Sequence, residues 1–486
     1  MQLRYYQKEA VEQALLHNNG YINSCTASGK SVIIAEICKH LTEPTLILQP
    51  SEEIFVQNYE KIKNVFGNDV ELGVYSASVS KTKTIKHITL ATIGSIKEAN
   101  YDDFKHFKNI LIDECHDVDS QKTKSFKDGM YKKLVKALKP DKLIGFTGTP
   151  FRNKQNFDPV ARKGSTTTHF LHKDTNNPIF KKCLYSYDLQ QAFKDKFITP
   201  IKYFITDYYS YYLREGGVDF TINDVVKDNQ RNNVLHKIIT QCKQFKQEND
   251  NKSALIFVAS IDEAMFVAME LKKLNITAKV VEGKTPSKQR ASFIEGFKNG
   301  SIQYIVNVAT MTTGFDFPAL ARVMLGRATN SLALYQQMLG RGIRLHPSKE
   351  YCECYDYCGS LARLGKLENI EYRGITTDSP SLICGNKVLI APPTLFETKI
   401  YQIVKNDFNV NAVITTLLQN NQVSQEDKIL IATKHKSGKF IGEYIASRDD
   451  RYIQNLLSAD KKYLQDFGNK IIKIKQRLNI LYSSHF

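Results

Sequence analysis

Four residues of this chain have the types and neighbours that phosphate chemistry requires. Lys30 and Ser31 open a helix-like stretch after a strand-like run, and Asp113 and Glu114 follow another apolar run. A lysine at a helix start neutralises phosphate charge, and a serine hydroxyl beside it can ligate magnesium. One carboxylate of an Asp-Glu pair can hold the metal through water, while its neighbour orients or deprotonates an attacking water. The combination predicts magnesium-dependent nucleotide hydrolysis.

The segment around Lys30 has the tail of a phosphate-binding loop, in which backbone N–H groups at a helix start cradle phosphates. Its expected phosphate-contacting residues are Thr26, Ala27, Ser28, Gly29, Lys30 and Ser31. The full G-x-x-x-x-G-K-[ST] pattern is not met, because Ser24 occupies the position of the first glycine. A surface turn that caps a helix is the alternative for this segment alone. The strand-like run before it and the helix-like stretch after it argue against that alternative.

The strands that must position these residues alternate with helices along most of the chain. The strand-like runs are 21–24, 45–49, 87–91, 109–112 and 142–146 in a first unit, and 254–258, 278–281, 303–306, 322–325 and 351–357 in a second unit that Pro200 opens. Helix-like stretches lie at 31–40, 51–66, 261–274, 288–298 and 332–342. This alternation predicts mainly parallel sheets covered on both faces. The carboxyl ends of parallel strands meet at one edge, so Lys30 and Asp113 can lie close together.

Composition indicates a large basic protein with real cores. The chain has 486 residues and is 42% apolar, which leaves room for about three domains. Lys and Arg number 67 against 50 Asp and Glu, and the net charge of +17 suits a polyanionic partner. No apolar run approaches the roughly 18 residues of a membrane span, and the charged start is unlike a signal peptide.

The cysteines indicate a reducing, intracellular setting, and we expect a cytoplasmic protein with no membrane partner. Nine cysteines are sparse and odd in number, which is unlike a disulfide scaffold. Cys352, Cys354 and Cys358 lie in or beside a strand-like run and include no CxxC pair, which disfavours zinc. Metal binding by these three residues stays an open question.

The segment from Gln337 to Arg344 supplies arginines of the kind that phosphoryl transfer uses. Arg341 and Arg344 are three residues apart, so on a helix they share one face. A guanidinium placed on the γ-phosphate stabilises the charge that develops there. A solvated basic helix end is the alternative, but it leaves the neighbouring run 310–318 unexplained. If both arginines belong to a second domain, hydrolysis requires domain closure.

Taken together, these segments resemble the superfamily 2 helicases of the DExH type. The matching segments are Leu3 to Gln7, Ser24 to Ser31, Gln49-Pro50-Ser51, Ala91 to Ser95, Asp113-Glu114-Cys115-His116, Thr147-Gly148-Thr149-Pro150, Thr310 to Pro318 and Gln337 to Arg344. The resemblance covers about residues 1–365. It implies an α/β fold of two tandem RecA-like parallel-sheet domains, at 1–197 and 198–365, and it implies ATP and Mg²⁺ as cofactors. A mainly helical C-terminal accessory domain is expected at 366–486.

The resemblance also implies roles for individual positions. The nucleotide contacts are Arg4 and Gln7 at the adenine, the loop residues 26–31, and Gly314 and Asp316. The catalytic set is Lys30, Asp113, Glu114, His116, Gln337, Arg341 and Arg344, with Ser31 and Asp113 toward the metal. The nucleic-acid contacts are Gln57, Thr92, Thr147, Thr149 and Thr310.

Two finer expectations follow from the same resemblance. We expect His116 to contact Thr147 and Gln337 and so to report domain closure. The family usually has glycine where this chain has Ala27, so we expect the loop backbone to differ slightly there.

The segments 113–116, 146–152 and 314–318 are nearer to DNA-directed members than to RNA-remodelling ones, and resemble phage branch-migration helicases and restriction-enzyme motors. This implies an ATP-dependent DNA helicase or translocase acting on branched, forked or single-stranded-tailed DNA. Other replication or recombination proteins are the further partners it implies. RNA remodelling stays open as an alternative, as does an ATP-gated clamp or motor subunit that does not unwind.

Two regions lie outside this scheme. The polar, aperiodic run 158–177 predicts an exposed excursion, and helix-like stretches are expected at 396–419 and 449–476. Residues 430–456 resemble a small module of phage exonucleases and replication proteins. Their basic glycine turn is either a contact to backbone phosphates or a solvated turn.

Overall fold

The computed structural model describes residues 2–67, 70–97, 99–118, 129–158, 163–173, 178–205, 211, 219–308, 317–377, 380–384 and 387–390. Only the backbone is described at 153–158, 163–167, 287 and 387–389. Predictions on Thr310, Gly314, Asp316 and the segment 391–486 therefore lie outside the described residues.

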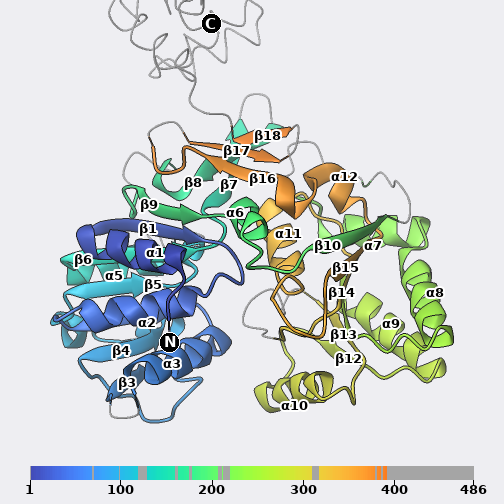
Figure 1. Cartoon of the computed structure of the whole chain (residues 1–486), viewed down its shortest axis with the longest axis horizontal. Coiled ribbons are helices and arrows are strands. Elements are labelled where there is room, and N and C mark those ends of the chain that lie inside the picture. Colours follow the sequence, from blue (N-terminus) through green and yellow to red (C-terminus); the bar gives the residue numbers. More distant parts are fainter. Residues whose placement is uncertain are drawn as a thin grey trace, which may run out of the picture. The chain divides into compact units, whose positions relative to one another are not determined.

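The first domain is built on a seven-stranded sheet with the order β3-β4-β2-β5-β6-β1-β9 (Figure 1). Its strands are β1 (Asn19–Ser24), β2 (Thr45–Gln49), β3 (Leu72–Tyr75), β4 (Ile88–Thr92), β5 (Asn109–Ile112), β6 (Lys142–Thr147) and β9 (Cys183–Tyr187). Its helices are α1 (Tyr5–Leu16), α2 (Lys30–His40), α3 (Glu52–Phe66), α4 (Ile93–Ile96), α5 (Met130–Leu138) and α6 (Leu189–Lys194), with the 3-10 turns η1 (Tyr101–Phe104) and η2 (Cys115–Asp117). Every strand pair is parallel, as predicted.

Both faces of this sheet are buried. Side chains of successive residues in a strand point to opposite faces, and each face is covered by a separate group of apolar residues. Ile47 and Leu111 pack with apolar residues of α1, α2 and α3. Leu46 and Ile110 pack in another cluster, with residues of α4 and α5. The near-continuous apolar runs found in the sequence therefore correspond to central strands.

The second domain is built on a six-stranded parallel sheet with the order β10-β15-β14-β11-β13-β12. Its strands are β10 (Ile201–Ile205), β11 (Ala254–Val258), β12 (Ala278–Val281), β13 (Tyr304–Asn307), β14 (Arg322–Gly326) and β15 (Cys352–Asp356). Its helices are α7 (Ile222–Arg231), α8 (Val234–Gln247), α9 (Ile261–Lys273), α10 (Ser287–Lys298), α11 (Leu332–Leu339) and α12 (Ser360–Leu364). The prediction of two parallel-sheet domains is confirmed.

Side-chain caps fix where the helices next to the sheet edges begin and end. Ser51, Ser260 and Ser331 precede α3, α9 and α11, and each hydroxyl accepts a backbone N–H of the first turn. The far end of α1 is held by Lys142, whose Nζ donates to the carbonyls of Ala14, Leu15 and His17 at 3.0, 3.0 and 2.5 Å. These bonds occupy carbonyls that the last turn of a helix leaves without partners.

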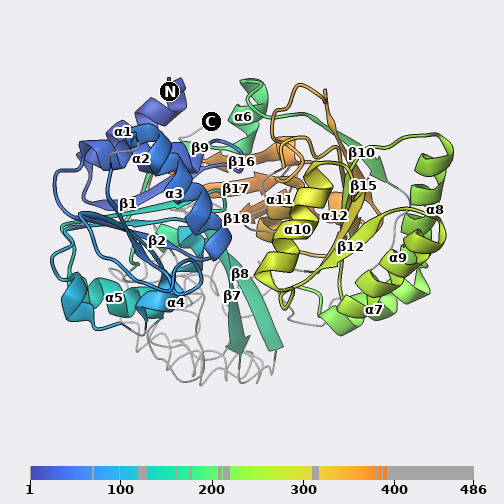
Figure 2. The same ribbon diagram turned by 90° about the horizontal axis from the view of Figure 1, so that it is seen from below.

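Two small sheets accompany the large ones. β7 (Phe151–Asp158) pairs with β8 (Lys163–Phe170), which leads into the 3-10 turn η3 (Leu171–Lys173) (Figure 2). After the 3-10 turn η4 (Leu367–Asn369), the strands β16 (Ile370–Arg373), β17 (Ser381–Cys384) and β18 (Lys387–Ile390) form an antiparallel sheet.

The prediction that 158–177 is an exposed excursion is wrong at its centre. Phe170 and Leu171 are buried in an apolar cluster that includes residues of both domains, and buried His172 bonds through Nδ1 to the Tyr21 hydroxyl at 2.8 Å. An apolar pair inside a polar run is enough to anchor the segment to the core.

All nine cysteines are buried, and none forms a disulfide. Cys352 and Cys354 lie in β15, and within the described part of the chain no three His, Cys, Asp or Glu side chains cluster as metal ligands would. No described helix combines the length and apolar character that crossing a membrane requires.

Candidate nucleotide-hydrolysis site

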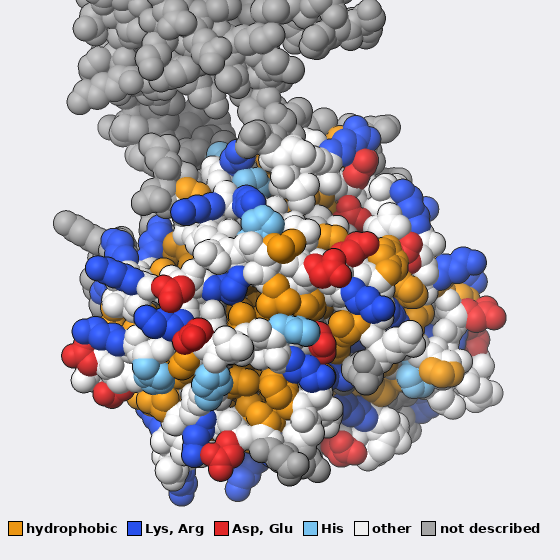
Figure 3. All heavy atoms as spheres, turned by 60° about the vertical axis from the view of Figure 1, so that its left-hand side comes forward, with side chains coloured by type: hydrophobic (Ala, Val, Ile, Leu, Met, Phe, Trp, Pro, Cys, Tyr) orange, Lys and Arg blue, Asp and Glu red, His pale blue; other side chains and the backbone are white. Residues whose placement is uncertain are grey.

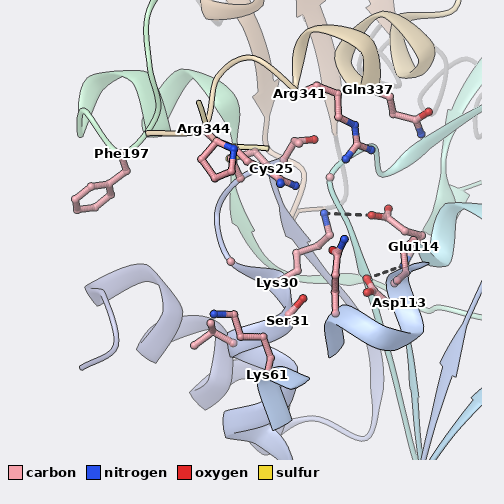
Figure 4. A pocket seen from close by; sticks show the side chains of 18 of the residues that line it. Cys25, Lys30, Ser31, Lys61, Asp113, Glu114, Phe197, Gln337, Arg341 and Arg344 are labelled. Carbon is pink, nitrogen blue, oxygen red and sulfur yellow. Dashed lines mark hydrogen bonds and ion pairs between the residues drawn. The ribbon is translucent and has the colours of Figure 1, made fainter. Parts of the chain in front are cut away.

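A cavity of about 620 Å³ lies at the carboxyl ends of β1 and β5, where parallel strands place their following loops side by side (Figure 4). The first domain contributes Arg4, Thr26, Ala27, Gly29, Lys30, Ser31, Gln57, Asp113, Glu114 and Thr149 among the lining residues. The second domain contributes Pro318, Gln337, Arg341, Arg344 and Leu345. Residues that are far apart in sequence thus share one cavity.

Glu114 is the centre of the charged network in this cavity. Its carboxylate lies 3.4 Å from Lys30 Nζ and 3.3 Å from His116 Nδ1. Burial alone would raise the pKa of Glu114, but the charges of Lys30 and His116 hold it below its usual value. Burial alone would lower the pKa of Lys30, but the negative charges of Glu114 and Asp113 raise it above its usual value. Glu114 is therefore ionised at neutral pH and can accept a proton from water.

Asp113 is held by hydrogen bonds to both carboxylate oxygens. Asn58 Nδ2 donates to its Oδ2 at 2.8 Å, and the Glu114 backbone N–H donates to its Oδ1 at 2.9 Å. Burial and then the charge of Glu114 raise the pKa of Asp113 to about 6, against the opposing charge of Lys30. The neighbouring carboxylates thus have distinct environments, as an ion-holding group and a base require.

Glu114 and Ala27 both have left-handed backbone, with φ of +47° and +69°. Non-glycine residues in this region are strained, and such strain concentrates at functional sites. The loop backbone at Ala27 therefore has the positive φ that glycine adopts freely, although this chain has alanine at that position.

His116 bridges the two domains. Its Nδ1 lies 2.9 Å from Thr147 Oγ1, and its Nε2 lies 3.5 Å from the side-chain amide nitrogen of Gln337. Both expected contacts of His116 are present, and its role in reporting closure stays a prediction.

Arg341 and Arg344 line the cavity from a turn, not from a helical face as predicted. α11 ends at Leu339, and Gly340 follows it as the C-terminal cap. A Cβ atom at Gly340 would come within 2.8 Å of Thr26 Cγ2, so glycine permits the close approach of this turn to the phosphate loop. Burial lowers the pKa of both arginines to about 10, which leaves both charged at neutral pH.

Helix α1 is tied to the back of the phosphate loop. The Tyr6 hydroxyl and Gln7 Nε2 both donate to the Ser28 carbonyl, at 2.8 and 3.0 Å. Gln7 Oε1 accepts the Arg4 backbone N–H, so both the oxygen and the nitrogen of the Gln7 amide are hydrogen-bonded. Gln7 is not among the residues that line the cavity. Arg4 does line it, and its guanidinium lies 4.2 Å from the ring centre of Phe197.

The residues predicted to contact nucleic acid do not all lie together. Gln57 and Thr149 line the nucleotide cavity, while Thr147 is fully buried against His116. The Thr92 hydroxyl lies 3.0 Å from the hydroxyls of both Ser76 and Ser95, near the ends of β3 and β4, and can donate its one proton to either. Their contacts with nucleic acid remain predictions.

Asn58 and Phe197 are site residues that sequence reasoning missed. Asn58 Nδ2 donates to Gln49 Oε1 at 3.0 Å as well as to Asp113, so it joins two motifs. A signal was present, since Ile54, Asn58 and Ile62 are spaced four residues apart on the buried side of α3. No comparable pattern marks Phe197.

Comparison with known families gives two adjoining matches. The pattern of the "Type III restriction enzyme, res subunit" family matches residues 1–152, and that of the "Helicase conserved C-terminal domain" matches residues 230–346. Their order, with the split cavity between them, decides the classification. The chain belongs to the superfamily 2 helicase family. In this family the two domains imply the use of ATP.

Curated relatives of this superfamily 2 helicase are distant. The ATP-dependent helicase named IRC3 of Saccharomyces cerevisiae is 22% identical over 87% of this chain and 61% of its own length. The ATP-dependent DNA helicase uvsW of phage T4 is 22% identical over 75% of this chain and 70% of its own length. Shorter matches include proteins named as RNA helicases. The chain thus spans about three fifths of the yeast relative.

Among solved structures, the ATP-dependent Type ISP restriction-modification enzyme LlaBIII bound to DNA is similar in fold. Its TM-score is 0.54 and its identity 13%, over 98% of this chain and 40% of that enzyme. At 13% identity this similarity concerns the fold alone.

Proposed function

We propose that this chain is an ATP- and magnesium-dependent DNA helicase or translocase that acts on branched or forked DNA. The observation that carries the proposal is the split cavity, in which Lys30 and Glu114 come from one domain and Arg341 and Arg344 from the other. Hydrolysis would then depend on the relative position of the domains, which is how chemistry drives movement along a strand.

In this proposal each side chain has a separate task on bound ATP. Lys30 neutralises phosphate charge, and Glu114 accepts the proton of the attacking water. Arg341 and Arg344 stabilise the charge that develops on the γ-phosphate. The 3.4 Å contact between Lys30 and Glu114 would exchange for contacts to phosphate and water.

The residues present fit a magnesium ion. Ser31 and Asp113 offer hard oxygen atoms, and so few protein ligands leave room for phosphate oxygens and water, as magnesium prefers. The hydrogen bonds from Asn58 and the Glu114 backbone orient the Asp113 carboxylate beforehand. When bound, the ion would neutralise charge on the β- and γ-phosphates.

The choice of DNA rests on relatives and motif types, and not on a charged surface. On the face in Figure 3, Lys and Arg side chains are interspersed with Asp and Glu and form no single basic track. The name of the phage T4 relative, an ATP-dependent DNA helicase, supports DNA as the polymer. Intracellular action on replication or recombination intermediates, with proteins of those processes, belongs to the same proposal.

The deciding experiment measures ATP hydrolysis with no polymer, single-stranded DNA, forked DNA, four-way junctions and RNA of matched sequence. We expect DNA to stimulate turnover more than RNA, and strand displacement to be fastest on forks or junctions. Lys30→Ala should lower turnover roughly 10²–10³-fold, because it removes one donor aimed at developing charge. Lys39→Ala, at the exposed far end of α2, is the matched control.

Other outcomes would redirect the assignment. Equal or greater stimulation by RNA would favour RNA remodelling. Stimulated hydrolysis without strand displacement would favour a clamp or a motor subunit. Turnover that persists in Lys30→Ala would remove the hydrolysis site from this cavity.

A further inference from the structure

Thr199, which lies between the two domains in sequence, is bonded to the turn that carries the cavity arginines. The side chain is 1% exposed. Its backbone N–H donates to the Ile343 carbonyl at 2.7 Å, and its hydroxyl donates to the Arg344 carbonyl at 2.8 Å. One residue thus bonds two consecutive carbonyls of the turn.

The turn depends on such bonds because it belongs to no helix or strand. α11 ends at Leu339 and β15 begins at Cys352. Within this connection, Lys349 Nζ donates to the Gly342 carbonyl at 2.6 Å and to the Leu320 carbonyl at 2.9 Å. With Thr199, three successive carbonyls from Gly342 to Arg344 are bonded, and the path of the main chain is fixed there.

Thr199 belongs to a short linker, residues 195–199, whose other end is anchored to the first domain. Asp195 accepts hydrogen bonds from the hydroxyls of Tyr5 and Tyr187, at 2.5 and 2.9 Å. Phe197, between the anchors, packs against the Arg4 guanidinium. Residues 195–199 therefore join the start of α1 to the arginine turn through a tether of at most about 14 Å between its end residues.

We propose that Thr199 is a positioning residue, whose hydroxyl holds the main chain at Arg344 so that the guanidinium reaches the γ-phosphate. This inference rests on the proposed function, because it assigns Arg344 to ATP hydrolysis. Thr199 does not touch the nucleotide, since it is absent from the cavity lining. Its effect passes through the position of Arg344.

The test uses Thr199→Val, which replaces the hydroxyl with a methyl group, and Thr199→Ser, which keeps the hydroxyl. We expect Thr199→Val to lower the kcat of ATP hydrolysis roughly tenfold, because small misplacements of a catalytic group are costly. KM for ATP and affinity for a fluorescent ADP should change less than about twofold. Affinity for ADP with aluminium fluoride, which imitates the transferring phosphoryl group, should fall with kcat. Thr199→Ser should recover most of both losses.

Thr45→Val separates positioning from a general loss of stability. Thr45 is also 1% exposed, and its hydroxyl donates to the Glu43 carbonyl at 3.0 Å, at the amino end of β2 away from the cavity. Thr45→Val should lower the unfolding midpoint about as much as Thr199→Val does, and it should leave kcat unchanged. If Thr199→Val is recovered unfolded, Thr199→Ala lacks the same hydroxyl and carries the same expectations.

The outcomes separate this inference from the function on which it rests. Wild-type kcat and wild-type affinity for ADP with aluminium fluoride in the hydroxyl-free variants would overturn the role of Thr199, while Lys30→Ala still loses turnover. Equal losses in Thr199→Val and Thr199→Ser would also overturn it. A wild-type protein that hydrolyses no ATP would instead refute the proposed function.

Discussion

At the scale of single residues, the strongest constraint is on Glu114, which is partly buried, strained and paired at once. Its carboxylate has Lys30 on one side and His116 on the other. Glu114→Gln keeps the shape but removes both the charge and the basic oxygen. We expect turnover to fall roughly 10²–10⁴-fold, the usual contribution of a positioned base, with nucleotide affinity retained. Steady-state hydrolysis beside fluorescent-ADP binding measures both, and parallel loss of affinity would point to a structural role.

Ala27 offers a stability test in the same loop. Its φ of +69° costs roughly 1–2 kcal/mol for a residue with a Cβ atom, whereas glycine adopts it freely at an entropic cost of about 0.5–1 kcal/mol. Ala27→Gly should therefore raise the free energy of unfolding by up to about 1.5 kcal/mol. Urea denaturation measures the change, and a clear loss of stability would mean that the Ala27 methyl group packs usefully.

Asn58 orients Asp113 and should matter for magnesium-dependent binding. Asn58→Leu preserves approximate volume but leaves Gln49 Oε1 and Asp113 Oδ2 without this donor, a change worth about 1–3 kcal/mol. We expect the magnesium-dependent part of fluorescent-ADP affinity to weaken, while affinity in chelator stays the same. A uniform loss with and without magnesium would contradict this account.

At the scale of helices and strands, burial decides how far sequence predicts structure. The runs at 45–49, 109–112 and 254–258 are apolar throughout because β2, β5 and β11 are buried on both faces. β10, an edge strand that is largely exposed, was missed although its sequence Ile-Lys-Tyr-Phe-Ile is mostly apolar. The turn after α11 was missed although Gly340 follows the helix; a side chain at Gly340 would meet Thr26 of the other domain, a contact that the local sequence does not record. Long-range contacts, and not propensity, set such features.

Helix α1 depends in the same way on a residue distant in sequence. Lys142 bonds three carbonyls at the end of α1, and Tyr6 and Gln7 at its start hold Ser28. Lys142→Met should destabilise the first domain by about 1–3 kcal/mol, since these carbonyls lose a buried donor. Urea unfolding measures this, with exposed Lys105→Met as the control. An unchanged midpoint would mean that water replaces the ammonium at no cost.

At the scale of the whole molecule, one ion pair links helices of the two domains. Arg290 Nη1 of α10 lies 2.5 Å from Glu53 Oε1 in the first turn of α3. Part-exposed pairs contribute about 0.2–1 kcal/mol, so Glu53→Arg or Arg290→Glu should each lower turnover roughly two- to fivefold by disfavouring the closed arrangement. The double reversal should recover part of the loss. Additive losses in a double-mutant cycle would show that the pair does not stabilise closure.

The rates at which the nine buried cysteines react with a thiol reagent can report how often each part of this molecule opens. A water-soluble thiol reagent can react only when a local or global fluctuation exposes the sulfur. Cys25, Cys38, Cys115 and Cys183 sample the first domain, and Cys242, Cys352, Cys354 and Cys358 sample the second. Peptide-resolved labelling rates, followed with and without nucleotide, would therefore tell whether the two halves loosen as one body or one after the other.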